Sequence, residues 1–589
     1  MATLQADTLL RGGIRSLVFP RSIVVVGASD RTYGQAEAVR NALRGGIPAW
    51  GVNPKRDEVL GLPCVPRIAE LPEVPELAVL LVGHTRVEEA LDEAAEAGVR
   101  AFVLPGLGNE AGAEGPPIAA RVAGRAAELE AALVGPNCMG IALPGPRTSS
   151  WIGTVPDTFL EGQVAVASHS GSIAEALVAV GLRVGFRCVA SLGAEAARDV
   201  ADVCGFFAED AETRAVGLFL EAVRRPAALA EALARLGKAE KPVVCLKVGR
   251  SQAAARAALT HTGSIVGSDR AFSAFLRAHG AIEVPDFPQL VETLEVLGRR
   301  RRPRGLRIAA VSESGGEGAL LADQGEAAGI PFAPLPDRLA GALQREFPNY
   351  VNPGNPLDAW AIADPERVYP RSLESIARSG AFDILLAQID LSQFRGAAEA
   401  KWCAMIVGAL ADAVDGSEVF PAVTSVQTAD PPPVLAALAR ERDVALLRGP
   451  GNALRALAAV ARWHPVPQAY ADEEDPVDLS DLVADGALPE YESTLVLERY
   501  GVPVTPLRRA RSTQEAARAA SELGFPVVVK QDGPAHKSGS GGVRLGLGDE
   551  RAVEAAAAEL GGRVLVAREV AAGHEILCGL DRDPQYGPV

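Results

Sequence analysis

The segment VAVASHSGSIAEAL at residues 164–177 has a second copy, IAAVSESGGEGALL, at residues 308–321. In both copies a run of small and β-branched residues ends in Ser-x-Ser-Gly, and a segment with helical periodicity follows. The alignment pairs three residues of one copy with three of the other: Ser168 with Ser312, Ser170 with Ser314, and Gly171 with Gly315. We therefore predict two successive domains in which a buried strand ends at this serine and a helix begins at the glycine.

The same alternation of strand and helix continues on both sides of the repeat. Short β-branched runs precede Ala-rich segments of helical period at SIVVVG (22–27), LAVLLVG (77–83), AFVLPG (101–106), ALVGPN (132–137), VGLFLE (216–221), VVCLKVG (243–249), DILLAQID (383–390) and FPAVTSV (420–426). This pattern is typical of βα units on a parallel sheet. The sequence therefore predicts an α/β protein.

Two stretches interrupt the alternation and indicate domain boundaries. GRRRRPRG at 298–305 is interpreted as a linker whose arginines are solvated, because the overall charge is acidic. Pro, Asp and Glu accumulate between His464 and Pro489, which is typical of an exposed hinge. A last segment, from Tyr491 to Val589, has its own strand, VVVK, and a Gly-rich loop.

Length and composition exclude several classes of protein. The 589 residues, 48% of them apolar, predict roughly four globular domains at about 150 residues each. A net charge of −16 disfavours nucleic-acid and membrane partners. The seven cysteines form no Cys-x-x-Cys pair, which argues against disulfides and zinc. The first twenty residues lack the apolar core of a signal peptide, so we expect a cytoplasmic protein that binds no metal through cysteine.

Both Ser-x-Ser-Gly turns are candidate phosphate sites. A helix leaves its first-turn amides unpaired at the positive end of its dipole, and this arrangement suits an anion. A serine that only caps the helix is the alternative. Two copies in successive domains favour one anion held between them by residues of both turns: Ser168, Ser170, Gly171, Ser312, Ser314, Gly315 and Gly316.

His261 is the candidate nucleophile. It lies in the polar, Gly-containing segment LTHTGSIVGS at 259–268, outside any helical apolar pattern. A neutral imidazole in such a loop can accept a phosphoryl group. An acidic partner is expected at the end of a strand, and Glu221, which ends VGLFLE, is the best candidate.

The N-terminal segment VVVGASDRTYG contains Gly27 and Gly34 but no GxGxxG, so it is a weak dinucleotide fingerprint. The next strand is followed by Asn53 and Lys55, whereas an NAD-binding domain places an acid there. The lysine favours a phosphorylated nucleotide and disfavours an NAD-dependent oxidoreductase. In the GPNCMG loop at 135–140, Cys138 is either a buried small residue or part of a pocket for a thiol ligand.

The C-terminal segment contains GFPVVVKQDGPAHKSGSGGVRLG, which suits a nucleotide site. Lys530 at the end of a strand can reach nucleotide phosphates, and the loop from Lys537 to Gly542 can direct its amides toward them. His536 is a second polar histidine in this loop. A plain surface loop is the alternative.

Together these motifs resemble the ADP-forming acyl-CoA synthetases, relatives of succinyl-CoA ligase, over nearly the whole chain. The resemblance is carried by VVVGASDR, GVNPK, GPNCMG, SHSG, LFLEAV, HTGSIVGS, SESGGEGALLAD, NPLD, GFPVVVK, HKSGSGGV and DPQYGPV. It implies a Rossmann-like CoA-binding domain, two flavodoxin-like parallel-sheet domains, a linker, and the N-terminal part of an ATP-grasp α+β domain. The corresponding residues are 1–145, 146–302, 303–465, 466–489 and 490–589.

The resemblance also implies roles for individual residues. His261 is the phosphorylated histidine, Glu221 is its partner, and His536 is a second histidine that shuttles phosphate. The CoA-binding residues are Gly27, Ala28, Ser29, Asn53, Lys55, Asn137 and Cys138. The ATP-binding residues are Lys530, Lys537, Gly541 and Gly542. The implied reaction interconverts acyl-CoA, ADP and phosphate with acid, CoA and ATP, through an acyl phosphate and a phosphohistidine.

The sequence departs from the family pattern in three places. The family has SLGN with an acid three residues after the asparagine, whereas Ala194 and Ala197 stand here, and His169 replaces a glutamine. These changes leave the acid substrate open. The chain also stops at Val589, so we expect the magnesium-binding acids of an ATP-grasp domain beyond it. The alternative function is a non-catalytic CoA-binding protein, and the expected partners are small molecules together with a second copy or an ATP-grasp subunit.

Overall fold

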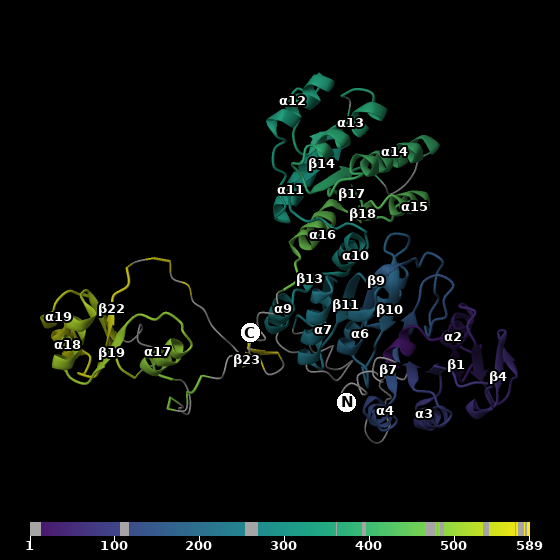
Figure 1. Ribbon diagram of the computed structural model, residues 1–589, viewed down its shortest axis with the longest axis horizontal. Helices are drawn as coiled ribbons and strands as arrows, with labels where there is room; N and C mark the ends of the chain where they lie inside the picture. The colour runs from purple at the N-terminus through teal and green to yellow at the C-terminus, as the bar shows by residue number, and fades with distance from the viewer. Residues whose placement is uncertain are drawn as a thin grey trace. The chain divides into compact units, whose positions relative to one another are not determined.

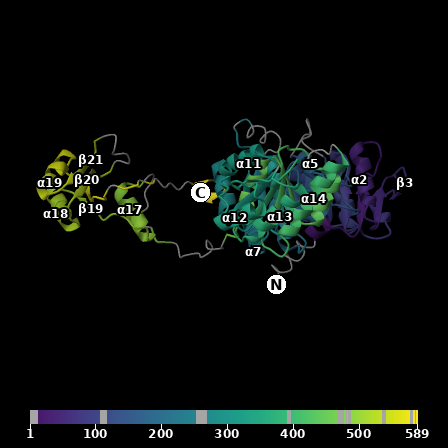
Figure 2. The same cartoon turned by 90° about the horizontal axis from the view of Figure 1, so that it is seen from above.

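The computed structural model of the chain divides into two compact units, shown in Figures 1 and 2. The first unit comprises residues 1–467 and 580–589, and the second comprises residues 468–579. The structure describes residues 13–106, 117–251, 253, 269–360, 362–390, 396–466, 477–479, 481–482, 488–533, 541–571, 573–574, 576, 582–583 and 586–588. The division at Pro467 falls within the predicted linker, and the finer domain boundaries stay predictions.

The first sheet of the first unit has seven strands in the order β3-β4-β2-β1-β5-β6-β7. Its strands are β1 (Ile23–Val26), β2 (Ala49–Val52), β3 (Glu58–Val59), β4 (Leu62–Val65), β5 (Leu77–Leu80), β6 (Ala101–Pro105) and β7 (Ala132–Cys138). All neighbours are parallel except the β3–β4 pair. The helices are α2 (Tyr33–Leu43), α3 (Val87–Glu96) and α4 (Ile118–Glu128), with 3-10 turns at Ile68–Glu70 and His84–Arg86.

The second sheet has six strands in the order β13-β12-β11-β9-β10-β8, with β9 near its centre. Its strands are β8 (Gly140–Ala142), β9 (Glu161–Ser168), β10 (Phe186–Ser191), β11 (Ala215–Leu220), β12 (Val243–Lys247) and β13 (Ile282–Val284). Only β8 is antiparallel to its neighbour. The helices are α5 (Gly171–Val178), α6 (Val200–Glu209), α7 (Pro226–Lys238), α9 (Asp269–Ala278) and α10 (Phe287–Leu297).

The third sheet has five parallel strands in the order β15-β14-β16-β17-β18. Its strands are β14 (Ile308–Ser312), β15 (Leu357–Asp358), β16 (Ile384–Gln388), β17 (Phe420–Ser425) and β18 (Ala445–Arg448). The helices are α11 (Gly315–Ala327), α12 (Asp337–Glu346), α13 (Pro365–Arg378), α14 (Ala397–Ala413), α15 (Pro433–Glu441) and α16 (Pro450–Arg462). Strand β14 therefore occupies the same place before α11 that β9 occupies before α5.

The second unit contains a four-stranded antiparallel sheet in the order β19-β22-β20-β21. Its strands are β19 (Leu507–Ala510), β20 (Val527–Gln531), β21 (Val543–Leu547) and β22 (Val564–Arg568). Helices α18 (Thr513–Leu523) and α19 (Glu550–Glu559) pack against each other, and α17 (Glu490–Arg499) lies on the other side of the strands (Figure 1). This is the predicted α+β segment.

The end of the chain belongs to the first unit. Strands β23 (Arg582–Asp583) and β24 (Gly587–Pro588) form a small antiparallel pair. Between them the ring of Tyr586 packs on α9, with centroid distances of 5.8 Å to Phe272 and 5.4 Å to Phe275. The last residues of the sequence thus contribute to the core beside α9.

The three sheets of the first unit share their apolar cores. One cluster joins Val25 of the first sheet to Ala167 of the second. Another joins Val166 of the second sheet to Ala310 of the third. Because neighbouring residues of β9 point to opposite faces, the central strand contributes to both clusters. Burial on both faces explains why its sequence is a continuous apolar run.

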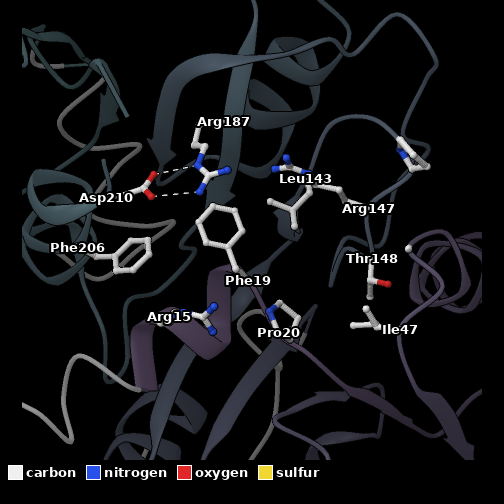
Figure 3. Close-up of a pocket in the computed structure, with 12 residues that line it drawn as sticks. Arg15, Phe19, Pro20, Ile47, Leu143, Arg147, Thr148, Arg187, Phe206 and Asp210 are labelled. Carbon is white, nitrogen blue, oxygen red and sulfur yellow. Dashed lines mark hydrogen bonds and ion pairs between the residues drawn. The ribbon is translucent and has the colours of Figure 1, made fainter. Parts of the chain in front are cut away.

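Figure 3 shows the seam between the first and second sheets, where a cavity of about 480 Å³ lies. The guanidinium of Arg187 lies 4.1 Å from the ring centroid of Phe19 and makes two hydrogen bonds to Asp210, of 2.9 and 3.1 Å. Arg147, also at the cavity, pairs with Glu161. These pairings neutralise the two arginines, so we interpret the seam as a structural contact.

The prediction that the arginines of 298–305 are solvated is wrong for three of them. Arg299 is buried and pairs with Glu295. Arg301 donates to the carbonyls of Val414 and Ser417, at 3.0 and 3.2 Å. Arg302 lies over Trp463 and donates to two carbonyls on the side of the second sheet, at Glu240 and Arg214. Burial lowers the pKa of Arg302 to about 10. The segment links the second sheet to the third, because each guanidinium supplies several hydrogen-bond donors.

Candidate active site

The first Ser-x-Ser-Gly turn connects β9 to α5 as predicted. The Ser168 hydroxyl donates to the Ser170 carbonyl at 2.8 Å, and Ser170 caps α5 by accepting from the Ile173 amide at 3.4 Å. The cap satisfies one first-turn amide, and the amides at Gly171 and Ser172 precede it, where a helix has no internal acceptor. The turn can therefore hold an anion.

His169, between the two serines, is buried and held from two sides. Its Nε2 lies 3.0 Å from Glu195 Oε1, and its Nδ1 accepts a hydrogen bond from the Glu221 amide at 3.1 Å. Burial lowers the pKa of His169, but the carboxylates of Glu195 and Glu221 outweigh it and the net pKa is raised. Arg224 lies 3.9 Å from the other oxygen of Glu195 and opposes this increase.

A cavity of about 20 Å³ lies within this cluster, which is enough for about one water-sized group. Its lining comes from three strand ends: His169, Gly193, Ala194, Glu195, Glu221, Ala222 and Arg224. Glu221 directly follows β11, as the sequence predicts for a residue at the carboxyl edge of a parallel sheet. Its predicted partner His261 lies outside the described residues.

The segment GPNC at 135–138, which the sequence analysis treats as a loop, instead forms the last residues of β7 and packs directly against this cluster. Amides of the loop after β10 donate to it, Ala194 to the Pro136 carbonyl at 2.8 Å and Ala196 to the Gly135 carbonyl at 3.0 Å. Gly193 has φ +60°, and a Cβ there would lie 2.3 Å from the Pro136 carbonyl oxygen. Only glycine fits so close an approach. The GPNC end of β7 in the first sheet and the His169 cluster of the second sheet therefore form one continuous site.

Of the predicted CoA-binding residues, Asn137 is the exposed residue near the end of β7 and has φ +59°. Cys138 is buried, and its thiol faces the Leu104 carbonyl at 3.4 Å. Burial raises the pKa of Cys138 to about 12. Of the two interpretations left open for Cys138, the structure agrees with a buried small residue.

The remaining predicted CoA-binding residues lie together at the carboxyl ends of β1 and β2. The side chain of Asn53 donates to the Ala28 carbonyl at 2.8 Å and accepts from the Lys55 amide at 2.9 Å. Gly27 has φ +82°, and a Cβ there would lie 2.5 Å from the Leu81 carbonyl oxygen. Ser29 accepts from the Arg31 amide at 3.2 Å. Lys55 is exposed, so its ammonium can meet a phosphate from solvent.

The second Ser-x-Ser-Gly turn has the same backbone contacts in an acidic environment. Ser312 donates to the Ser314 carbonyl at 3.0 Å, and Ser314 accepts from the Glu317 amide at 3.2 Å. A Cβ on Gly315 would lie 3.3 Å from a carboxylate oxygen of Asp358. Gly316 is exposed in the first turn of α11.

Two more carboxylates flank this second turn. Glu313 accepts from the Trp402 indole at 2.6 Å and from the Asp390 amide at 3.2 Å. Burial raises the pKa of both Glu313 and Glu317, and Glu313 adds to the increase at Glu317. Within the described ranges, neither glutamate forms an ion pair. No hydrogen bond or ion pair joins the two turns among the residues that the structure describes.

In the second unit Lys530 is at the end of β20 and donates to Glu490 of α17 at 2.6 Å. A nucleotide phosphate would have to displace this carboxylate. Gly541 has φ +73°, and Gly542 accepts from the Gln531 amide at 2.8 Å. The other two predicted residues of this site, His536 and Lys537, lie outside the described residues.

The part of the chain that the structure describes contains no cluster of three His, Cys, Asp or Glu side chains arranged for a metal ion. In that same part, no helix is long and apolar enough to span a membrane.

Sequence reasoning missed the acid that holds His169. Glu195 is buried with φ +49° and also accepts from the Val200 amide at the start of α6, at 2.7 Å. Its place just after β10 is the signal that could have identified it, because functional side chains gather at strand ends. Arg224, Asp358 and Glu490 were also missed, because the contacts that make these residues relevant come from other segments of the chain.

Comparison with known proteins reveals three family matches along the chain. Residues 21–144 match a CoA binding domain, residues 161–297 match a succinyl-CoA ligase like flavodoxin domain, and residues 483–589 match an ATP-grasp domain.

Similar proteins extend over almost the full sequence. An acetate–CoA ligase [ADP-forming] I from Archaeoglobus fulgidus is 31% identical over 613 residues, covering 97% of this chain and 85% of its own. A trans-feruloyl-CoA synthase from an unknown prokaryotic organism is also 31% identical, covering 99% and 85%. The solved acetyl-coenzyme A synthetase 1 of Ca. Korarchaeum cryptofilum, in complex with phosphate and ADP, has a TM-score of 0.66 at 25% identity. It covers 76% of this chain and 96% of its own.

Proposed function

Because the chain belongs to the ADP-forming acid–CoA ligases, we propose that it interconverts acyl-CoA, ADP and phosphate with acid, CoA and ATP through a phosphohistidine at His261. The observation that supports this proposal most is the continuous site formed by the GPNC end of β7, the α5 start and the His169–Glu221 cluster. It brings a segment of the CoA-binding domain next to a turn that can hold an anion, as acyl transfer from CoA to phosphate requires. The relatives act on different acids, so the acid substrate stays open.

In this proposal each part of the site has a physical task. Gly27, Ser29, Asn53, Lys55 and Asn137 line the path of CoA, and Lys55 meets a phosphate. The amides of Gly171 and Ser172 hold inorganic phosphate at the positive end of α5. Phosphate oxygen attacks the thioester carbonyl and displaces the CoA thiolate, giving an acyl phosphate. The neutral imidazole of His261 then takes the phosphoryl group, and the carboxylic acid leaves.

The role of Glu221 is to accept the remaining ring proton of His261. This hydrogen bond orients the imidazole and stabilises the charge that develops during transfer. Its position at the end of β11 beside the cavity supports that role.

Nucleotide chemistry belongs to the second unit in this proposal. Lys530, Gly541 and Gly542, with Lys537 and His536, would bind ADP and receive the phosphoryl group. Magnesium supplies charge neutralisation to nucleotide phosphates when bound. Among the described residues no three His, Cys, Asp or Glu side chains are grouped to hold it, and Mg²⁺ at such sites usually takes one or two carboxylates beside the phosphates. We further propose a cytoplasmic protein that works as an oligomer or with an ATP-grasp subunit.

The central test is phosphohistidine formation from labelled phosphate and a panel of acyl-CoAs, beginning with acetyl-CoA. We expect acid-labile label in the wild type and none in His261→Ala, with unchanged thermal unfolding. Glu221→Gln should label at least about tenfold more slowly, in the range measured for loss of a charged catalytic interaction. CoA binding without any label would instead indicate a non-catalytic CoA-binding protein.

The CoA site has a separate test. Lys55→Ala should weaken CoA binding about ten- to a hundredfold, because a hydrogen bond to a charged group is worth about 1.5–3 kcal/mol. Calorimetry measures this, with Lys401→Ala, an exposed lysine on α14, as the matched control. Tighter binding of NADH than of CoA would contradict the assignment.

A further inference from the structure

His169 joins the ends of three neighbouring strands. It directly follows β9, its Nε2 meets Glu195 in the loop after β10, and its Nδ1 receives the Glu221 amide after β11. Its own amide donates to the Phe219 carbonyl on β11 at 3.0 Å. The side chain is 6% exposed and that of Glu195 is 3% exposed. The imidazole is therefore a fixed bridge across the wall of the cavity.

The two hydrogen bonds determine where the ring proton sits. A backbone N–H can donate only to a ring nitrogen that carries no proton, so Nδ1 is bare. The proton is then on Nε2, where it is donated to the Glu195 carboxylate. In this neutral tautomer both ring nitrogens are satisfied, and the Glu221 main chain is held against the imidazole.

We propose that His169 is a positioning residue, which holds the end of β11 so that Glu221 faces the small cavity beside the first Ser-x-Ser-Gly turn and which releases it when Nδ1 is protonated. The proposal rests on the proposed function of Glu221. A protonated Nδ1 would point its hydrogen at the Glu221 N–H, and two donors cannot share a hydrogen bond. The Glu221 main chain must then move away from the ring.

The charges around His169 make this protonation accessible. Glu195 and Glu221 favour the imidazolium, while burial and Arg224 oppose it, and the balance raises the pKa of His169 above its ordinary value near 6.5. As the pH falls through that raised pKa, Nδ1 gains its proton and the bridge opens. Activity that depends on Glu221 should therefore decline on the acidic side, beginning above pH 6.5.

Replacing His169 by glutamine separates the role of its two hydrogen bonds from the role of its protonation. In His169→Gln the amide oxygen can accept from the Glu221 N–H and the NH₂ can donate to Glu195, but the side chain at this position no longer titrates. In His169→Leu neither hydrogen bond forms. We expect His169→Leu to slow phosphohistidine formation at pH 8 at least about tenfold, since misplaced groups can cost about a hundredfold. His169→Gln should keep most of the rate at pH 8, and its acid limb should lie at lower pH than that of the wild type, because only protonation of the His261 nucleophile then remains.

The experiment records the rate of His261 labelling from acyl-CoA and phosphate between pH 5.5 and pH 9 for wild type, both variants and His279→Gln. The ring of His279, just after α9, bonds to the Phe275 carbonyl and packs on the Phe275 ring, and it has no part in the proposed site, so its replacement should leave the profile unchanged. An acid limb in His169→Gln equal to that of the wild type would overturn the proposal, as would equal rates for all four proteins at pH 8.

Nitrogen NMR of histidine-labelled protein gives a readout that needs no turnover. The resonance that disappears in His169→Gln should show a bare Nδ1 and a protonated Nε2 at pH 8, and protonation of both at lower pH. A protonated Nδ1 at pH 8 would overturn the proposal. If no protein labels His261 while the NMR result holds, the failure lies in the proposed function and not in the bridge.

Discussion

The two Ser-x-Ser-Gly turns share a backbone and differ in their charge. Around the first, the carboxylate of Glu195 is hydrogen-bonded by His169 and lies 3.9 Å from Arg224, and Glu221 lines the same cavity. Around the second, Glu313, Glu317 and Asp358 lie at the helix start, and the glutamates have raised pKa values without an ion pair among the described residues. Nearby negative charges disfavour a phosphate. We therefore expect a helix start to hold an anion only where its surroundings allow it.

Both turns lie in the first compact unit, on sheets that pack together. Breaking the link between these two sheets should give the largest expected effect, on the free energy of unfolding. Glu292 of α10 is buried and binds Arg183 at 2.9 Å and Arg448 at 2.9 Å, which links the second sheet to the third. Glu292→Ala should lower the free energy of unfolding by about 3–5 kcal/mol, because a buried guanidinium loses its partner. Calorimetry of the first unit's transition measures the change.

Lys401→Ala is the matched control, because its pair with Glu366 is exposed and 3.6 Å long. It should change stability by less than about 0.5 kcal/mol. If the two variants were equally stable, the two sheets would not depend on the buried pair.

Adding one negative charge to each turn tests the comparison directly. Ser172→Asp places a carboxylate in the first turn of α5, where Ser172 is exposed, and should slow labelling from phosphate about ten- to a hundredfold. Gly316→Asp makes the same change in α11, where a Cβ would approach nothing more closely than the Ser314 hydroxyl at 4.0 Å. It should slow labelling less than about threefold, because we expect no phosphate there.

Each aspartate also lies at the positive end of its helix dipole, which stabilises the helix, so neither variant should unfold at a lower temperature. Equal losses of labelling in the two variants would support the alternative that the sequence suggests, in which both turns hold one phosphate.

The smallest expected effect comes from Glu317, whose burial raises its pKa above the ordinary 4.5. The native state therefore binds its proton more tightly than the unfolded state, and stability falls as pH rises from about 4.5 through the raised pKa. Glu317→Gln should be more stable than wild type at pH 7 by less than about 1 kcal/mol, because solvent screens this partly exposed group. Thermal unfolding at pH 7 and pH 4 should show the difference only at pH 7.

The fold was predictable because its signals are local. Each buried parallel strand is a short apolar run, and each Ser-x-Ser-Gly turn places its cap next to the strand it follows. The candidate site was only partly predictable. His169 and Glu195 are 26 residues apart and meet because β9 and β10 are neighbours in the sheet, which spacing along the chain does not reveal. The acids around α11 converge in the same way from separate segments.

The prediction of solvated arginines is wrong for Arg299, Arg301 and Arg302, and the cause is physical. A basic, Pro-containing run has the composition of a solvated linker, yet a guanidinium can be buried where several acceptors surround it. For Arg301 and Arg302 these acceptors are main-chain carbonyls, and no sequence pattern records where a carbonyl points.

That choice of acceptor has an evolutionary consequence. Arg301 and Arg302 bind the carbonyls of Val414, Ser417, Glu240 and Arg214, and every amino acid supplies the same carbonyl. The side chains at these four positions can therefore be substituted without loss of these hydrogen bonds, provided that the backbone conformation is kept. Substitutions should accumulate more freely on the carbonyl side of this junction than at the two arginines. The hydrogen bonds of the junction can thus be retained while the sequence around it changes.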